Sequence, residues 1–270
     1  MRAGWVVLAA VSVLDASADP IVIRHDREDA RYLALGQRFP AVCRIRTGGA
    51  GTLVALHWVL TAAHVARGVS AGDEVVIGAR AIPVARVVLH PGWSTPQTNV
   101  VDDIALLELA TAVDAVSPVP LYRGRDETGR VTTFVGHGGT GNGQSGAMPS
   151  DGRLRGATNR VERTDSRWIV FRFDPPAEGA TELEGISGPG DSGGPAFLEM
   201  DGVIFLAGVS SWQDNRGQGG RQGVYGVLEY YARVSSYVGW IDEVIGTASN
   251  PPQAAAQSAV LVPSRPSVDR

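Results

Sequence analysis

The sequence predicts an all-β protein, either a barrel or a sandwich. Short runs that alternate apolar and polar residues, many of them β-branched, recur along most of the chain, separated by breaks rich in glycine or proline. The clearest runs are GTLVALHWVLT (51–61), IPVARVVLHP (82–91), DIALLELA (103–110), RVTTFVG (130–136) and RWIVFRFDPP (167–176). The chain has 34 glycines among 270 residues and 44% hydrophobic residues, which is typical of a globular protein with many turns.

Three further segments follow from local patterns. Two apolar runs flank Asp201-Gly202, a dipeptide that readily takes the positive φ angles of a tight hairpin turn. A helix is expected after Ser235-Ser236, where apolar residues recur on one face until Gly246 ends it; they are Tyr237, Val238, Ile241, Val244 and Ile245. The segment from Gly138 to Arg155 has too many glycines for regular structure and is expected to be a loop.

The two ends of the chain differ from the rest. Residues 1–18 combine Arg2, an apolar run and the small residues Ala16-Ser17-Ala18, the pattern of a secretory signal peptide cleaved after Ala18. The apolar run is too short to cross a bilayer. The tail 247–270, rich in proline, alanine, serine and glutamine, is expected to be disordered. We therefore expect a secreted or periplasmic protein with no membrane contact after signal cleavage.

Composition argues against several kinds of partner. The net charge of −4 provides no basic surface of the kind that binds nucleic acid, so no nucleic acid is expected to bind. Cys43 is the single cysteine, so no disulfide can form within the chain. It lies in the alternating segment FPAVCRI (39–45), which predicts a strand with a buried, unreactive thiol. We expect no metal and no cofactor.

The most specific string in the chain is GPGDSGGPAF (188–197), in which glycines surround Ser192. A serine hydroxyl becomes an effective nucleophile when a base removes its proton and N–H groups stabilise the oxyanion that forms. Glycines on both sides permit the tight turn that aims such N–H groups at the charge. The string also fits GxSxG, the nucleophile elbow of α/β-hydrolases, so a lipase or esterase has to be considered.

The order of residues along the chain separates these two classes. An α/β-hydrolase has its catalytic histidine after the serine, but all five histidines, at 25, 57, 64, 90 and 137, precede Ser192. His64 ends the apolar run WVLTAAH, and Asp103 opens the apolar strand DIALLEL. Asp102 is the rival carboxylate, but only Asp103 adjoins that strand. The order histidine, aspartate, serine is that of chymotrypsin, whereas subtilisins have the aspartate first.

LTAAH (60–64), DIALL (103–107) and GDSGGP (190–195) together resemble the three signature segments of the trypsin-like (chymotrypsin) serine protease family. The likeness extends from about Phe39 to Ile245. It implies two antiparallel six-stranded β-barrels, about 39–121 and 122–246, with the active site between them and a short C-terminal helix. Residues 19–38 then form an N-terminal segment or propeptide before the protease domain, 39–246.

The resemblance also implies a role for each matching residue. Ser192 is the nucleophile, His64 the general base and Asp103 the residue that orients the histidine. The N–H groups of Gly190 and Ser192 form the oxyanion hole. The implied substrate-binding residues are Ile186, Ser211, Trp212, Gln213 and Glu229, and Ser211 also supports Asp103. The other histidines are interpreted as structural or solvated, with His57 inside a strand.

Two features depart from the pattern of many animal relatives. Gly49 and Val65 stand where those relatives carry the cysteines that clamp the histidine loop, so this loop must depend on packing. In the family, cleavage exposes an IVGG-like start whose ammonium pairs with the aspartate before the serine, here Asp191. Ile21-Val22 resembles only part of that start and lies farther from Phe39-Pro40 than the pattern predicts.

The specificity of the primary pocket remains open at this level. Ile186 at its base favours an apolar P1 residue, because a buried aliphatic group cannot pair with a cation. Glu229 on its wall favours a basic one. Two alternative functions also remain: a catalytically inactive binding protein with the same cleft, and an esterase-leaning hydrolase on the same fold. The expected partners of the monomeric enzyme are polypeptide substrates and a protein protease inhibitor.

Overall fold

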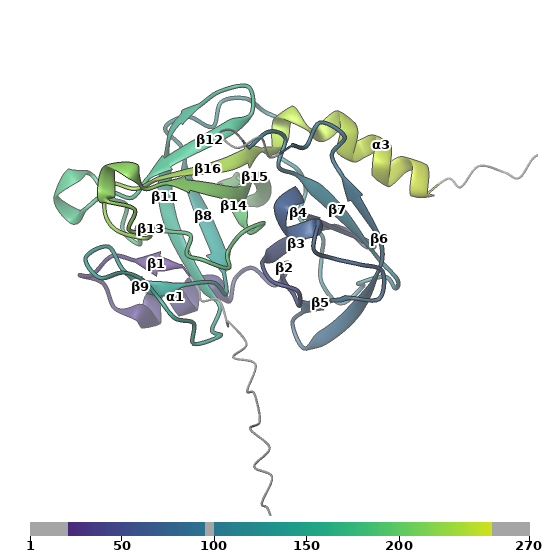
Figure 1. Cartoon of the computed structure of the whole chain (residues 1–270), viewed down its shortest axis with the longest axis horizontal. Coiled ribbons are helices and arrows are strands. Elements are labelled where there is room, and N and C mark those ends of the chain that lie inside the picture. The colour runs from purple at the N-terminus through teal and green to yellow at the C-terminus, as the bar shows by residue number, and fades with distance from the viewer. Residues whose placement is uncertain (1–20, 95–99, 250–270) are drawn as a thin grey trace, which may run out of the picture.

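Two closed antiparallel barrels of six strands each form the body of the protein (Figure 1). The structure is a computed structural model that describes residues 21–94 and 100–249. The first barrel has the strand order β2-β3-β4-β7-β6-β5, and the second has the order β11-β12-β16-β15-β14-β8. The all-β fold class expected from the sequence is thereby confirmed.

The strands of the first barrel are β2 (Val42–Ile45), β3 (Ala50–Ala55), β4 (Trp58–Thr61), β5 (Glu74–Ile77), β6 (Arg80–Leu89) and β7 (Ala105–Leu109). Those of the second are β8 (Val131–Gly136), β11 (Arg155–Thr164), β12 (Trp168–Arg172), β14 (Pro195–Met200), β15 (Val203–Asp214) and β16 (Leu228–Arg233). The hairpin between β14 and β15 turns at Asp201-Gly202, whose φ angles of 50° and 77° are both positive, as the sequence predicts.

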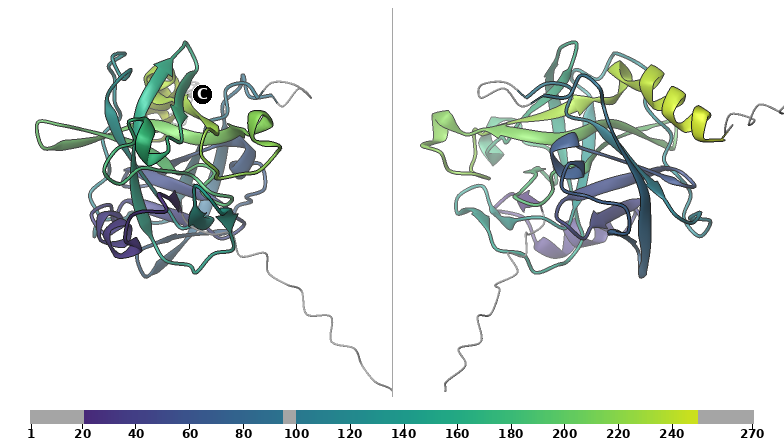
Figure 2. Two further views of the ribbon diagram at one scale, coloured as in Figure 1. Left: turned by 90° about the vertical axis from the view of Figure 1, so that its left-hand side faces the viewer. Right: turned by 45° about the vertical axis from the view of Figure 1, so that its right-hand side comes forward.

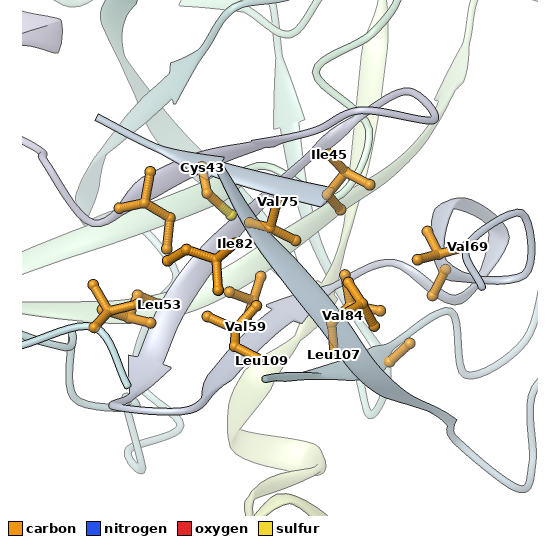
Figure 3. Close-up of a cluster of buried hydrophobic side chains, with 14 of the residues drawn as sticks. Cys43, Ile45, Leu53, Val59, Val69, Val75, Ile82, Val84, Leu107 and Leu109 are labelled. Atoms are coloured by element: carbon orange, nitrogen blue, oxygen red, sulfur yellow. The ribbon is translucent and has the colours of Figure 1, made fainter. Parts of the chain in front are cut away.

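Each barrel encloses its own apolar core. That of the first barrel is aliphatic, and alternate residues of its strands point inward to form it, among them Cys43, Leu53 and Leu107 (Figure 3). The second is built around aromatic rings, with Phe134 stacked on Tyr231 at a centroid distance of 5.0 Å. Strand pairing and apolar packing therefore hold both barrels together without a disulfide.

A third apolar cluster joins the barrels to each other and to the C-terminal segment. Leu60 and Leu106 of the first barrel, Val209 of the second and Ile241 of the C-terminal helix are all buried in it. This shared cluster fixes the relative position of the two barrels, and loops from both converge along their junction.

A small four-stranded sheet of order β10-β9-β1-β13 lies beside the second barrel. Its strands are β1 (Val22–Ile23), β9 (Thr140–Asn142), β10 (Gly146–Met148) and β13 (Gly185–Ile186). The prediction of a loop from Gly138 to Arg155 is therefore wrong in its middle part, where β9 and β10 form a hairpin. The glycines permit this pairing, because Gly141 and Gly146 have positive φ angles and a Cβ on Gly141 would lie 2.1 Å from the Gly146 carbonyl oxygen.

The α-helices are α1 (Asp29–Gly36), α2 (Ala63–Ala66) and α3 (Val238–Ser249), and one-turn 3-10 helices occur at Pro176–Glu178, Arg216–Gln218 and Val234–Ser236. α1 packs against β11, and α3 extends along the outside of the first barrel (Figures 1 and 2). The predicted stop at Gly246 is wrong, since α3 continues to Ser249. Gly246 is exposed and has a helical backbone, so it weakens the helix without ending it.

Residues 247–249 of the predicted disordered tail thus belong to α3, and the rest of the tail lies outside the described residues. The predicted signal peptide also lies outside them. Within the described part of the chain, no helix is both long and apolar enough to cross a membrane.

Candidate active site

His64 and Asp103 lie at the same end of the first barrel because the strands that carry them are neighbours. β4 and β7 are antiparallel, with Thr61 opposite Ala105. His64 follows β4 in the one-turn helix α2, and Asp103 precedes β7 by one residue, Ile104. The strand pairing therefore brings together two side chains that are 39 positions apart in the sequence.

The imidazole of His64 is held by two hydrogen bonds between the same two residues. The backbone N–H of His64 donates to Asp103 Oδ1 at 2.8 Å, and His64 Nδ1 lies 2.7 Å from Asp103 Oδ2. Since a carboxylate only accepts hydrogen bonds, Nδ1 must carry the hydrogen and Nε2 keeps its lone pair. The geometry thus favours the tautomer in which Nε2 can act as a base.

The Asp103 carboxylate is buried, with 1% of the residue exposed. Burial by itself raises the pKa of Asp103, but the hydrogen bond and charge of His64 and the Ser211 hydroxyl outweigh it, so the pKa lies below the ordinary value. Ser211 Oγ donates to Asp103 Oδ2 at 2.5 Å. The second barrel thereby supplies, through β15, a partner for a carboxylate of the first.

The loop that carries Ser192 docks against the same end of the first barrel. The Ser192 carbonyl accepts the Ala50 N–H at 2.8 Å, and the Gly193 N–H donates to the Ser210 carbonyl at 2.8 Å. A Cβ on Gly193 would lie 2.2 Å from Thr61 Oγ1, three residues before His64. Only glycine permits this approach, which brings the half-buried Ser192 to the end of β4 where His64 lies.

Two backbone amides beside Ser192 have no acceptor within the part of the chain that the structure describes. The N–H groups of Asp191, Gly193 and Gly194 donate to backbone carbonyls, whereas those of Gly190 and Ser192 donate to none. Gly190 has a φ of 93°, a conformation that favours glycine. Unpaired N–H groups flanking a serine are the arrangement that stabilises an oxyanion.

Asp191 holds this loop from inside. Its buried carboxylate accepts the N–H of Gly138 at 2.6 Å and that of Gly188 at 2.9 Å. A Cβ on Gly136 of β8 would lie 1.9 Å from Asp191 Oδ1, so a side chain at position 136 would displace this carboxylate. The loop conformation therefore depends on Asp191.

The positions expected to replace a disulfide lie in contact. A Cβ on Gly49 would lie 2.9 Å from both methyl groups of Val65 and 2.9 Å from the Ser192 carbonyl oxygen. Close packing of Gly49 on Val65 thus joins the histidine helix to the serine loop without a covalent link.

Two segments, one of which carries Ser192, flank the buried Glu229, and the group of polar atoms between them is called the polar compartment below. One is 187–192 and the other is 210–213, and the Gly193–Ser210 hydrogen bond joins them at one end. At the other end Gln213 Nε2 donates to the Ser187 carbonyl at 2.6 Å. Glu229 lies between the two segments, because its Oε2 accepts the Ser187 N–H at 3.0 Å and its Oε1 accepts the Ser210 hydroxyl at 3.4 Å.

The other substrate-binding candidates differ in their surroundings. Ile186 is fully buried among apolar side chains, including Val22, its partner in the small sheet. Trp212 stacks on Tyr230 with a centroid distance of 3.9 Å. Ser187 and its buried partner Tyr231, whose hydroxyls are 2.5 Å apart, were not predicted from the sequence. No spacing in the sequence signals this contact, because it depends on how β16 passes under the serine loop.

The other four histidines lie elsewhere. His57 is in the turn between β3 and β4, so its expected place inside a strand is wrong; the long run GTLVALHWVLT forms a hairpin, and Leu53 pairs with Val59. His25 Nδ1 lies 2.7 Å from the Tyr225 hydroxyl. Burial lowers the pKa of His137 to about 4. His90 packs against rings near the start of α3.

Comparison with known proteins agrees with this architecture. Residues 33–241 match the family model described as Trypsin. Similar proteins include the complement C1s subcomponent of Rattus norvegicus, 29% identical over 75% of this chain and 33% of that protein. The calcium-dependent serine proteinase of Mesocricetus auratus is 30% identical over 77% of this chain and 33% of that protein. Protein masquerade of Drosophila melanogaster is 31% identical over 72% of this chain and 20% of that protein.

Because the family model covers more than half of the chain, this protein belongs to the trypsin family, and the resemblance predicted from the three sequence segments is confirmed. The chain spans a third or less of the length of these relatives.

Proposed function

We propose that this chain is a secreted serine endopeptidase that cleaves peptide bonds with Ser192, His64 and Asp103. The observation that carries the proposal is the buried Asp103 carboxylate, which accepts two hydrogen bonds from His64 next to the serine loop. Such an arrangement holds an imidazole as a base aimed at one hydroxyl. The resemblance alone suggests the class, and this geometry supports the role of each residue.

The proposed reaction has two halves. Ser192 Oγ attacks the peptide carbonyl carbon while its proton passes to His64 Nε2, and the Asp103 carboxylate stabilises the resulting imidazolium. The carbonyl oxygen becomes an oxyanion that accepts hydrogen bonds from the Gly190 and Ser192 N–H groups. The carbon–nitrogen bond then breaks, and the amine leaves with the proton from His64. Water, deprotonated by the same imidazole, then attacks the acyl carbon, and the imidazolium returns the proton to Ser192 Oγ as the bond between that oxygen and the acyl carbon breaks.

Labelling with a fluorophosphonate and assays on matched peptide and ester substrates test this function. The wild type is expected to be labelled and to cleave both substrates. Ser192→Ala is expected to lose labelling and at least about 10⁴-fold in kcat. Ser117→Ala, a change at an exposed serine, is the matched control and should retain both. An unlabelled wild type would indicate a binding protein, and ester cleavage without peptide cleavage would indicate an esterase.

We further propose that the compartment between 187–192 and 210–213 receives the P1 side chain and selects a cation. A substrate carbonyl at Ser192 directs its side chain between these two segments. The polar groups not fully used there are acceptors: the Glu229 carboxylate, and Gln213 Oε1, which is buried without a hydrogen-bond partner among the described residues. A side chain that ends in donors, such as lysine, satisfies both. Of the two predictions from the sequence, this favours the basic one.

Export and an N-terminus at Ile21 complete the proposal. Ile21 is 1% exposed, and Val22 and Ile23 pair with β13, close to the loop of Asp191. Cleavage before Ile21 would create an ammonium next to this loop, as the resemblance implies. Sequencing the N-terminus of the exported active form tests both points; an active form that begins before residue 19 contradicts both, and one that begins at 19 or 20 contradicts only the cleavage before Ile21.

A further inference from the structure

Asp102, the neighbour of the catalytic candidate Asp103, has a backbone conformation that few residues adopt. Its φ is 49°, and among the described residues the only other non-glycine residue with positive φ is Asp201. The Asp102 carbonyl accepts the Ile104 N–H at 2.8 Å, which closes a tight turn around Asp103. Side chains with a Cβ resist this region, and aspartate and asparagine tolerate it best. The chain is therefore bent sharply where Asp103 leaves it.

The Asp102 side chain points to different partners from those of Asp103. Its Oδ1 accepts the Tyr237 hydroxyl at 2.9 Å and lies 3.5 Å from Arg167 Nε. Tyr237 directly precedes α3, and Arg167 is in the turn between β11 and β12. Burial raises the pKa of Tyr237 far above its ordinary value, so its hydroxyl remains a donor at every pH at which the protein is assayed. Two elements outside the first barrel thus hold Asp102.

The space around this carboxylate is shaped to fit it. A Cβ on Gly92 would lie 2.3 Å from Asp102 Oδ2. His90 Nδ1, 3.9 Å from the same oxygen, accepts the Gly92 N–H at 3.1 Å and so presents no hydrogen to Asp102. Burial lowers the pKa of His90, an effect that favours the uncharged ring. The His90 ring packs edge-on against Tyr237, with centroids 5.2 Å apart, and this contact helps to hold the Tyr237 ring in place.

We propose that Asp102 is a positioning residue for catalysis: its carboxylate, held across the junction of the barrels by Tyr237 and Arg167, fixes the turn from which Asp103 reaches His64. The inference rests on the proposed function. Because Asp103 makes both hydrogen bonds to His64, a shift of this turn moves the imidazole relative to Ser192. Displacements of about 1 Å are enough to change turnover by about 100-fold.

Substitutions at Asp102 separate positioning from general stability. Asp102→Ala removes both anchors and is expected to lower kcat by about 10- to 100-fold with KM nearly unchanged. Asp102→Asn keeps an acceptor for Tyr237 and tolerates positive φ, so it should restore most of kcat. Asp201→Ala places the same strain in the distant β14–β15 hairpin and is the matched control. It should lower Tm through backbone strain alone and leave kcat unchanged.

A second measurement does not depend on turnover. In Ser192→Ala protein, the NMR signal of the His64 Nδ1 hydrogen reports its bond to Asp103. This signal should weaken or move when Asp102→Ala is added, and should stay in place with Asp102→Asn or Asp201→Ala. If Asp102→Ala lowers Tm but leaves kcat and this signal as in the parent protein, the positioning role is refuted. If no variant is active yet the signal moves as expected, the proposed function fails and the positioning of His64 stands.

Discussion

Replacing Glu229 by glutamine removes the charge from the proposed P1 compartment with little change of shape. An amide oxygen can accept the Ser187 N–H that now donates to Glu229 Oε2 at 3.0 Å. Glu229 is 2% exposed, and burial raises its pKa to about 8. Near neutral pH the side chain of Glu229 is therefore mainly uncharged before substrate binds. Binding of an ammonium then requires Glu229 to ionise.

The size of the effect follows from these two opposing contributions. An ammonium and a carboxylate about 4 Å apart attract by about 4 kcal/mol at an effective dielectric constant near 20. Ionising Glu229 costs about 1.4 kcal/mol for each pH unit below its pKa and almost nothing above it. Preference for lysine over norleucine, which lacks only the ammonium, should rise about tenfold per pH unit up to about pH 8 and then level.

The assay measures kcat/KM between pH 6 and 9 for two peptides that differ only in lysine or norleucine at P1. Any effect of pH on the catalytic steps is common to both peptides and cancels in their ratio. Glu229→Gln should make the ratio independent of pH and, at pH 9, at least about 100-fold lower. Glu199→Gln, an isosteric change at an exposed acid, should change neither the ratio nor its dependence on pH. A wild-type ratio that is flat with pH, or unchanged by Glu229→Gln, excludes selection of lysine by the Glu229 charge and favours apolar selection at Ile186.

Three further predictions concern stability and reactivity. Arg155→Met should lower the free energy of unfolding by about 2 kcal/mol in urea titrations, because Asp29 and Asp151 lose the buried guanidinium that they share; an unchanged midpoint contradicts this. Burial raises the pKa of Glu184 from its ordinary 4.5 to about 7. The contribution of Glu184 to the free energy of unfolding is therefore fully present below pH 4.5. It is lost as the pH rises through 7, by about 3 kcal/mol in all, and Glu184→Gln should remove this fall in the free energy of unfolding. The Cys43 thiol, buried and with its pKa raised to about 12, should resist a disulfide reagent at pH 8 until the protein unfolds; rapid labelling of native protein contradicts its burial.

The sequence predicts those parts of the fold that depend on local patterns of residues. Alternation reveals the barrel strands, and Asp201-Gly202 reveals the hairpin, because period and turn chemistry depend on neighbouring residues only. The chain order of His64, Asp103 and Ser192 reveals the candidate site. The polar compartment could be recognised only in part, since Ser187 meets Tyr231 through contacts 44 positions apart. Pairings of this kind have no local signature.

The N-terminal segment shows how extra length in the sequence can hide a strand pairing. Ile21-Val22 lies too far from Phe39 along the sequence for a standard start, yet Val22 pairs with Ile186 in the small sheet. The helix α1 (Asp29–Gly36) accounts for the difference, because eight residues in a helix advance the chain by only about 12 Å. Its first residue, Asp29, is bound to the buried Arg155 of β11, which fixes the helix without a disulfide. The extra length therefore folds back on the second barrel, and the buried Ile21 packs beside Gly185 of β13.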